Sequence, residues 1–535
     1  MSALWHLVRA QVEVELTERL RAPATVLTVL ASIVLSFLWL PDPKKNVASV
    51  SWTSVDGVRT SGAYNSAYLG LAIGILVSSF LTLVGFYLIA GSVRKDREKG
   101  VGAILAATQM SKTSYLLGKL TAHFAYLLVL SLLCLVSGFA VFLRYGTGSF
   151  GVLRFVAPSL LLAIPGLAIT AACALLFDVT PGLRSRGGLI LWFFFWSFVL
   201  VLPPLFMPIN VAGYPIDDPA GIGAVTSIIE RHVPEAKAHS VNVGLEYSDK
   251  PFRRVMWEGV PLFGGLLFVR VASLLWLLAP FALAVFFFDR FDPARQKRRA
   301  DRPGAFARLA KRFRRDVEEN GTLGESPSAV RLAPVAVSPA RWRAVAAEAR
   351  MIWDSGSFLK WPLLGSAVLA AVIPAGEING AAAALLILLA PLLSEVAARE
   401  ELTGTRALVH CQPAVPSSTV IWKLFSTMLF VVVLGLPAAM RAALSSPQRG
   451  LVFLVGLLFV AAFATGAGAL TRGGKLFSGI YVGLWYASLQ KVKAVDFCGI
   501  STPEQRLAVP LPYLASAAVL IALALFLERR RAARD

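Results

Sequence analysis

Two short polar segments in different halves of the chain share residue types at one spacing. A single offset of 304 positions superimposes their glycines, alanines, serines, lysines and leucines: Gly100 with Gly404, Ala103 with Ala407, Ser114 with Ser418, Lys119 with Lys423 and Leu120 with Leu424. Each segment holds a few apolar residues between charged flanks. Such a pattern suits docking, because a small apolar knob can enter a groove of another protein while a charged rim sets its orientation.

The residues that we expect to make these contacts are the apolar ones and the polar ones around them. They are Arg97, Glu98, Gly100, Ile104, Leu105 and Thr108 in the first segment, and Glu400, Glu401, Gly404, Leu408, Val409 and Pro413 in the second. The competing interpretation is two ordinary solvated loops whose bases only fix membrane topology. That interpretation accounts for the bases but not for the apolar residues, so we favour docking.

Residue patterns typical of catalysis are missing from the sequence. The nearest approach to a phosphate-binding loop is Gly473-Gly474-Lys475, but Ala469 and Leu476 stand where that motif needs Gly and Ser or Thr. Four cysteines and five histidines are scattered without metal-ligand spacing. We therefore expect no enzyme activity, no metal site and no cofactor bound by this chain.

Composition places these segments in a membrane protein. Of 535 residues, 56% are hydrophobic and 16% charged, and the mean hydropathy is +0.66. A soluble domain carries about 25% charged residues. The net charge of +20 fits basic cytoplasmic loops better than nucleic-acid binding.

Apolar runs long enough to cross a bilayer predict an all-α, polytopic fold with about twelve spans. The expected spans lie near 24–40, 68–92, 115–143, 153–177, 188–208, 261–288, 359–375, 380–397, 422–440, 450–470, 476–490 and 509–528. Basic residues gather in alternate connections, so the positive-inside rule predicts that both termini are cytoplasmic. Loop 209–260 then faces outward, and we expect Asp217-Asp218 within it to form a solvated turn.

The internal similarity divides the chain into two repeats of six spans. We assign 1–290 to the first repeat, 291–338 to a basic cytoplasmic linker close to the membrane, and 339–535 to a shorter second repeat. Leu4–Leu20 has the spacing of an amphipathic helix at the membrane surface, although its alternating residues also allow a strand. Trp342–Ile352 resembles it at the start of the second repeat.

The first polar segment resembles the cytoplasmic loop of ABC-2 type transporter permeases. The resemblance lies in Glu98-Lys99-Gly100, Ile104-Leu105, Thr108 and Gly118-Lys119, and the second copy adds Gly404-Thr405 and Pro413. It implies amphipathic elbow helices and two coupling helices on a fused pair of permease units. A separate ATPase, in two copies, would bind ATP and Mg²⁺ and dock on segments 94–113 and 398–419. The implied function is export across a bacterial inner membrane, with lipids as further partners, no nucleic acid, and no requirement for homo-oligomers.

Two other functions stay open. A membrane scaffold or assembly factor would use the same body to anchor other proteins, with loop 209–260 as the contact. An ion-coupled carrier is disfavoured, because such carriers need carboxylates inside their spans and the predicted spans hold almost none. Arg270, inside the sixth predicted span, could line a path, snorkel or pair with a lipid phosphate.

Overall fold

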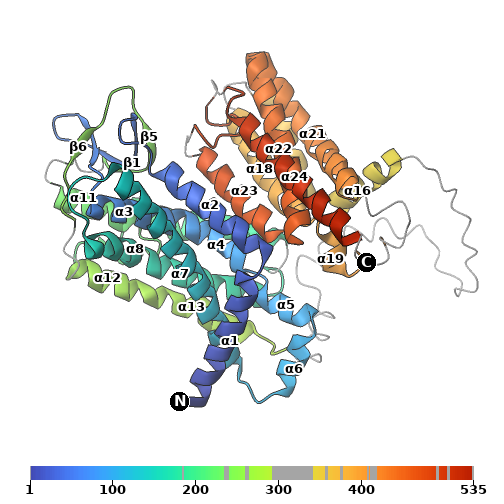
Figure 1. Ribbon diagram of the computed structural model, residues 1–535, viewed down its shortest axis with the longest axis horizontal. Coiled ribbons are helices and arrows are strands. Elements are labelled where there is room, and N and C mark those ends of the chain that lie inside the picture. The colour runs from blue at the N-terminus through green and yellow to red at the C-terminus, as the bar shows by residue number, and fades with distance from the viewer. Residues whose placement is uncertain are drawn as a thin grey trace, which may run out of the picture.

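The structure is a computed structural model of the whole chain. It describes residues 2–183, 186–233, 236, 240–259, 264–291, 341–355, 359–373, 378–406, 409, 419–489, 493–502 and 506–532. The predicted basic linker 291–338 lies outside these residues apart from its first position. Most of the described chain is helical, as the apolar runs predict (Figure 1).

Helices of the first half follow the predicted order. They are α1 (Ser2–Leu20), α2 (Pro23–Trp39), α3 (Ser66–Leu76), the π-turn η1 (Val77–Leu81), α4 (Thr82–Ile89), α5 (Ser92–Glu98), α6 (Val101–Ala107), α7 (Lys112–Tyr145), α8 (Val152–Val179), α9 (Arg186–Phe195), η2 (Trp196–Val201), α10 (Leu202–Phe206), α11 (Ile222–His232), α12 (Gly265–Ser273), η3 (Leu274–Leu277) and α13 (Leu278–Phe287). The N-terminal segment is therefore a helix rather than a strand.

The second half repeats this order with fewer interruptions. Its helices are α16 (Arg341–Ser355), α17 (Lys360–Val372), α18 (Ile378–Leu393), α19 (Arg399–Thr403), α21 (Thr419–Ser445), α22 (Pro447–Thr471), α23 (Lys475–Leu489) and α24 (Pro510–Ala532). In each half a leading helix bends sharply into the next one, by 76° between α1 and α2 and by 107° between α16 and α17. Each bend fits the predicted surface helix followed by a span, and it fits equally a single span that is broken at the bend.

Some of the twelve predicted spans correspond to helices that are long and apolar enough to cross a membrane. Among the described residues, seven helices are long and apolar enough to cross a bilayer, or up to nine if each bent pair counts as one span. Helices at Ile190–Pro204 and Asn379–Leu393 are apolar but shorter. The chain is thus a polytopic, mostly helical membrane protein, while twelve crossings and their orientation stay predictions.

A small sheet is the element that the sequence did not predict. It has the strand order β5-β1-β2-β6, in which β2 pairs with β1 in antiparallel and with β6 in parallel fashion. The strands are β1 (Val47–Thr53), β2 (Arg59–Gly62), β5 (Asn242–Tyr247) and β6 (Arg253–Val255); a two-residue ladder joins β3 (Asn210–Val211) and β4 (Tyr214–Pro215). The sheet thereby ties the expected outer loop 209–260 to the first hairpin, at the opposite end of the helices from α5 and α6 (Figure 1).

The two halves meet mainly through two helix pairs, and α2 of the first half also contacts α22 and α23 of the second. Helix α4 of the first half packs on α23 of the second, and α9 of the first half packs on α18 of the second. Under the predicted repeat, α4 corresponds to α18 and α9 to α23, so these contacts are counterparts of each other. Aromatic rings fill the junction: Phe193 lies 4.9 Å from Trp485, and Trp196 lies 5.2 Å from Tyr486, between ring centroids.

Close approach of α4 and α23 depends on two glycines one helical turn apart. A β-carbon added at Gly483 would lie 2.9 Å from Val84 Cγ2, and one added at Gly479 would lie 3.2 Å from Val84 Cγ1. Small residues at this spacing let helix backbones approach within a membrane. The pair therefore sets the distance between the halves at this contact.

We expect Gly479→Leu/Gly483→Leu to destabilise the folded chain by about 1–3 kcal/mol, because the added side chains overpack the α4–α23 contact. Thermal unfolding of the purified protein in mild detergent measures the effect. Gly365→Leu is the matched control, since a side chain at Gly365 meets open space. Equal melting temperatures for the double variant and the control would contradict this account of the interface.

Candidate functional site

Each predicted docking segment contains a glycine whose backbone turns the chain after a short helix. Gly100 has φ +77° and Gly404 has φ +69°. A β-carbon at either position would meet nothing within 4 Å, so backbone conformation, not space, accounts for the glycines. Left-handed φ values cost other residues about 1–2 kcal/mol. The two residues aligned by the offset of 304 thus share a conformation as well as a type.

Helix α6 presents apolar side chains to solvent on one face only. Ile104 is 69% exposed and Val101 is 40% exposed. Leu105 is half-buried and packs against a cluster that includes Tyr115, Phe288 and Phe291. Among the residues predicted to form the knob, Ile104 is thus free to enter a groove, whereas Leu105 holds α6 on the protein.

The last residues of the first half fasten α6 and its flanks. The Phe291 ring lies against Gly102, where an added β-carbon would stand 2.6 Å from the ring. Arg97 pairs with Asp289 at 3.1 Å, and the Lys112 ammonium donates to the Phe288 carbonyl at 2.6 Å. These contacts hold the first docking segment in place. They come from residues distant in the sequence, so the sequence of the segment itself does not reveal them.

The remaining predicted residues of the first segment are exposed. Arg94 Nε lies 3.6 Å from Glu98, whose side chain is 58% exposed. Thr108 ends α6 and donates its hydroxyl to the Leu105 carbonyl at 2.8 Å. Its own carbonyl accepts a hydrogen bond from Arg290. Solvent therefore reaches a charged rim beside the apolar face.

A buried ion cluster lies directly behind the first segment. Lys119 of α7 is only 2% exposed, and its ammonium contacts Glu15 of α1 and Asp96 of α5, the latter at 2.7 Å. Tyr115 donates its hydroxyl to the same Asp96 carboxylate at 2.6 Å. The cluster joins the N-terminal helix, the docking segment and a predicted span.

The second half contains the corresponding cluster. Lys423 of α21 is also 2% exposed, and it contacts the Glu400 carboxylate and donates to the Val396 carbonyl at 3.0 Å. Glu348 of α16 pairs with Arg399 of α19 at 2.9 Å. Asp96 and Glu400 are separated by the same 304 positions as the two lysines. In each half a docking-segment carboxylate therefore contacts a buried lysine, while the leading-helix glutamate contacts that lysine in the first half and Arg399 in the second.

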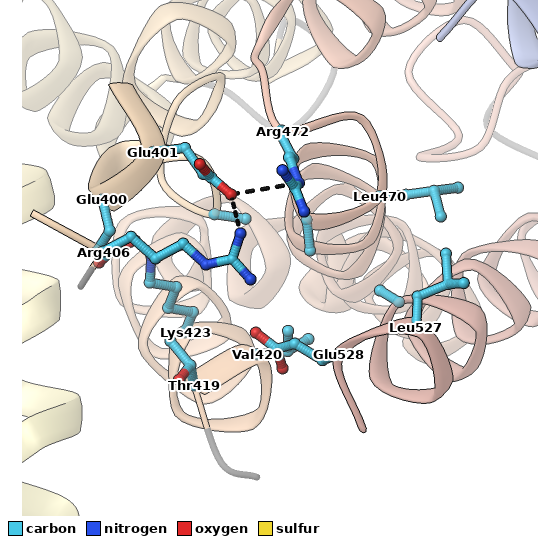
Figure 2. A pocket seen from close by; sticks show the side chains of 13 residues that line it. Glu400, Glu401, Arg406, Thr419, Val420, Lys423, Leu470, Arg472, Leu527 and Glu528 are labelled. Carbon is cyan, nitrogen blue, oxygen red and sulfur yellow. Dashed lines mark hydrogen bonds and ion pairs between the residues drawn. The ribbon is translucent and has the colours of Figure 1, made fainter. Parts of the chain in front are cut away.

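Charged residues of the second segment border a pocket between α19, α21, α22 and α24 (Figure 2). Glu401 lies between two guanidinium groups, contacting Arg406 and approaching Arg472 at 3.2 Å. Val409 is half-buried. The predicted contacts Leu408 and Pro413 lie outside the described residues. Among described residues of α19, Leu402 offers an exposed apolar side chain, at 44%.

One buried carboxylate behind the first segment was missed at the sequence level. Asp178, near the end of α8, accepts hydrogen bonds from the backbone N–H groups of Gly91 at 2.5 Å and Val93 at 3.2 Å. It thereby caps α5, whose own first residues supply no side-chain cap. The available signal was an aspartate at the end of a long apolar run.

Arg270 is satisfied by backbone carbonyls rather than by a carboxylate of another span. It is 1% exposed, and it donates to the carbonyls of Leu161 at 3.2 Å, Leu162 at 2.8 Å and Pro219 at 3.1 Å. Pro165 has no N–H to bond the Leu161 carbonyl, so the arginine replaces that donor. Arg270, which belongs to α12, therefore joins α12 to α8 and to the outer loop through hydrogen bonds.

The expected solvated turn at Asp217-Asp218 is wrong for Asp218. Its side chain is fully buried and accepts hydrogen bonds from the backbone of Gly221 at 2.8 Å and Ala224 at 2.7 Å. It therefore caps α11 beside Arg270. The glycine-rich sequence Ala220-Gly221-Ile222-Gly223, in which Gly221 is the N-cap residue, hid the start of α11 from the sequence pattern.

Comparison with known proteins does not assign the chain to a family. The sequence matches no protein-family model, and no curated protein or solved structure matches it. The class that the fold defines is a polytopic, mostly helical membrane protein.

Replacing the ammonium of the first cluster should be costly. We expect Lys119→Met to destabilise the chain by about 3–5 kcal/mol, because two partly buried carboxylates lose their counter-ion. Thermal unfolding in detergent measures it, with Lys99→Met as control because that side chain is 62% exposed.

Neutralising the carboxylates as well should recover stability. Glu15→Gln/Asp96→Asn/Lys119→Met then melts above Lys119→Met, since no carboxylate is left facing the position of the lost ammonium. A Lys119→Met protein as stable as the Lys99→Met control would show that the cluster does not hold these helices together.

Proposed function

We propose that this chain is the membrane subunit of an ATP-driven transporter of the ABC-2 type, formed from two fused permease units. Segments 94–113 and 398–419 are its docking sites for two copies of a separate ATPase. ATP and Mg²⁺ bind to that partner. Export across a bacterial inner membrane is the activity that this arrangement serves.

The observation that carries the proposal is the paired design of the two segments. Each has a left-handed glycine, and behind each a carboxylate and a buried lysine recur at one offset, Asp96 with Lys119 and Glu400 with Lys423. Solvated loops that only fix topology need no buried ion pair and no exposed Ile104. A device that must receive force needs both a contact surface and a rigid connection to the spans.

The connection explains how movement of a partner would reach the membrane. A push on α6 passes through Asp96 and Lys119 to α7, and through Glu15 to α1. In the second half it passes from α19 through Glu400 and Lys423 to α21. The contacts α4–α23 and α9–α18 are then where the halves shift against each other, opening the path alternately to the two sides.

The direct test is capture of an ATPase with the tagged chain, purified in mild detergent from its native membrane. Wild type should bring down a stoichiometric nucleotide-binding subunit and ATP hydrolysis. Ile104→Asp should weaken this association about thirtyfold, because a charge at the centre of an apolar contact costs as much as losing a binding hot spot.

Val55→Asp is the matched control. Val55 is 76% exposed and lies in the β1–β2 connection, at the other end of the first-half helices. The control should retain the ATPase at the wild-type level. Equal recovery with both variants would remove α6 from the docking site, and purification without any ATPase would favour a membrane scaffold instead.

A further inference from the structure

A second cavity, separate from the pocket at α19, lies where the bent pair α1–α2 meets α4, α5, α7 and α23. Its volume is about 810 Å³. The wall combines apolar side chains, among them Leu88, Tyr126 and Leu476, with charged side chains of α1 and α23. A cavity of this size exceeds what a single small ion fills, and it falls within the range of ligand sites.

Charge in the cavity does not balance. The lining carboxylates Glu13, Glu15 and Glu18 are each matched within the protein, by Arg9, Lys119 and Lys95 respectively. Arg21 and Lys475 line the same cavity, and neither forms an ion pair with a residue that the structure describes; the buried Asp178 interacts electrostatically with Lys475 but does not line the cavity. The surplus is therefore positive.

A third donor in the cavity wall has no partner. Arg19 uses its terminal nitrogens on the Leu88 and Ile89 carbonyls, at 3.3 and 3.4 Å, and on Glu15 at 3.5 Å. Its Nε is buried and, within the described part of the chain, has no acceptor. A buried donor without an acceptor costs free energy unless a ligand satisfies it.

The position of the cavity is where we expect the membrane surface to lie. It lies in the angle of the 76° bend between α1 and α2, where a surface helix turns into a predicted span. Basic side chains above apolar walls at this level are the features that hold an anionic lipid headgroup.

We propose that this cavity binds a phospholipid with a net anionic headgroup. Arg21, Lys475 and Arg19 Nε would face the phosphate, and Leu88, Tyr126 and Leu476 would contact the upper acyl chains. The site joins the two halves, since α1 and α2 belong to the first and Lys475 begins α23 of the second. The proposal does not depend on the docking of an ATPase.

Native mass spectrometry of the purified chain with added dioleoylphosphatidylglycerol tests the proposal, with dioleoylphosphatidylcholine as the lipid of equal chains and no net charge. Wild type should retain the anionic lipid preferentially. Arg21→Gln and Lys475→Gln should each weaken retention about fivefold, and the double variant about twenty-fivefold, because each base near the surface contributes separately.

Arg144→Gln/Arg154→Gln removes two exposed bases that do not line the cavity and controls for overall charge. Equal retention of the two lipids by wild type, or equal losses in the cavity and control variants, would overturn the proposal. Competition by inorganic phosphate as strong as that by the lipid would also overturn it, because the ligand would then be a soluble phosphate compound. Circular dichroism of each variant verifies its folding.

Discussion

The structure around both docking segments depends on one constraint. A lysine ammonium that is buried near the start of a long helix must have a carboxylate beside it. Lys119 and Lys423 are both 2% exposed, and both meet a carboxylate that comes from the segment preceding their own helix. Pairing therefore fixes where each segment lies against the spans. Additional carboxylates from α1 and α16 bring the leading helices to the same places, so three elements in each half meet at one charged cluster.

The two halves use this shared arrangement unequally. Behind α6, an aromatic cluster and the Arg97–Asp289 pair add a second attachment, formed by the residues that end the first half. The second segment has instead a pocket in which Glu401 contacts Arg406 and Arg472, and Glu528 of α24 forms part of the wall (Figure 2). A partner that docks on both segments would meet an apolar knob at the first and a more charged surface at the second. The two segments can differ in this way because each has its own sequence.

Local patterns in the sequence were sufficient for some of this. Apolar runs located the helices, and the offset of 304 matched Gly100 to Gly404, whose shared left-handed backbone is visible only in the structure. Contacts between residues that are distant in the sequence could not be predicted from local patterns. The sheet pairs Val47–Thr53 with Asn242–Tyr247, and Phe291 packs on Gly102. In a helix as short as α6, periodicity could not tell that Leu105 faces inward and Ile104 outward. Asp218 and Arg270 found buried partners in loop and span backbone, which no spacing rule indicates.

The most direct measurement is the mass of the intact assembly, obtained by native mass spectrometry after gentle extraction from the native membrane. Two related clusters behind two docking segments predict one copy of this chain with two copies of an ATP-binding subunit. ATP hydrolysis should follow that complex through further purification. A chain that leaves the membrane alone, or only with partners that bind no nucleotide, would contradict the account of the two segments as force-receiving docking sites.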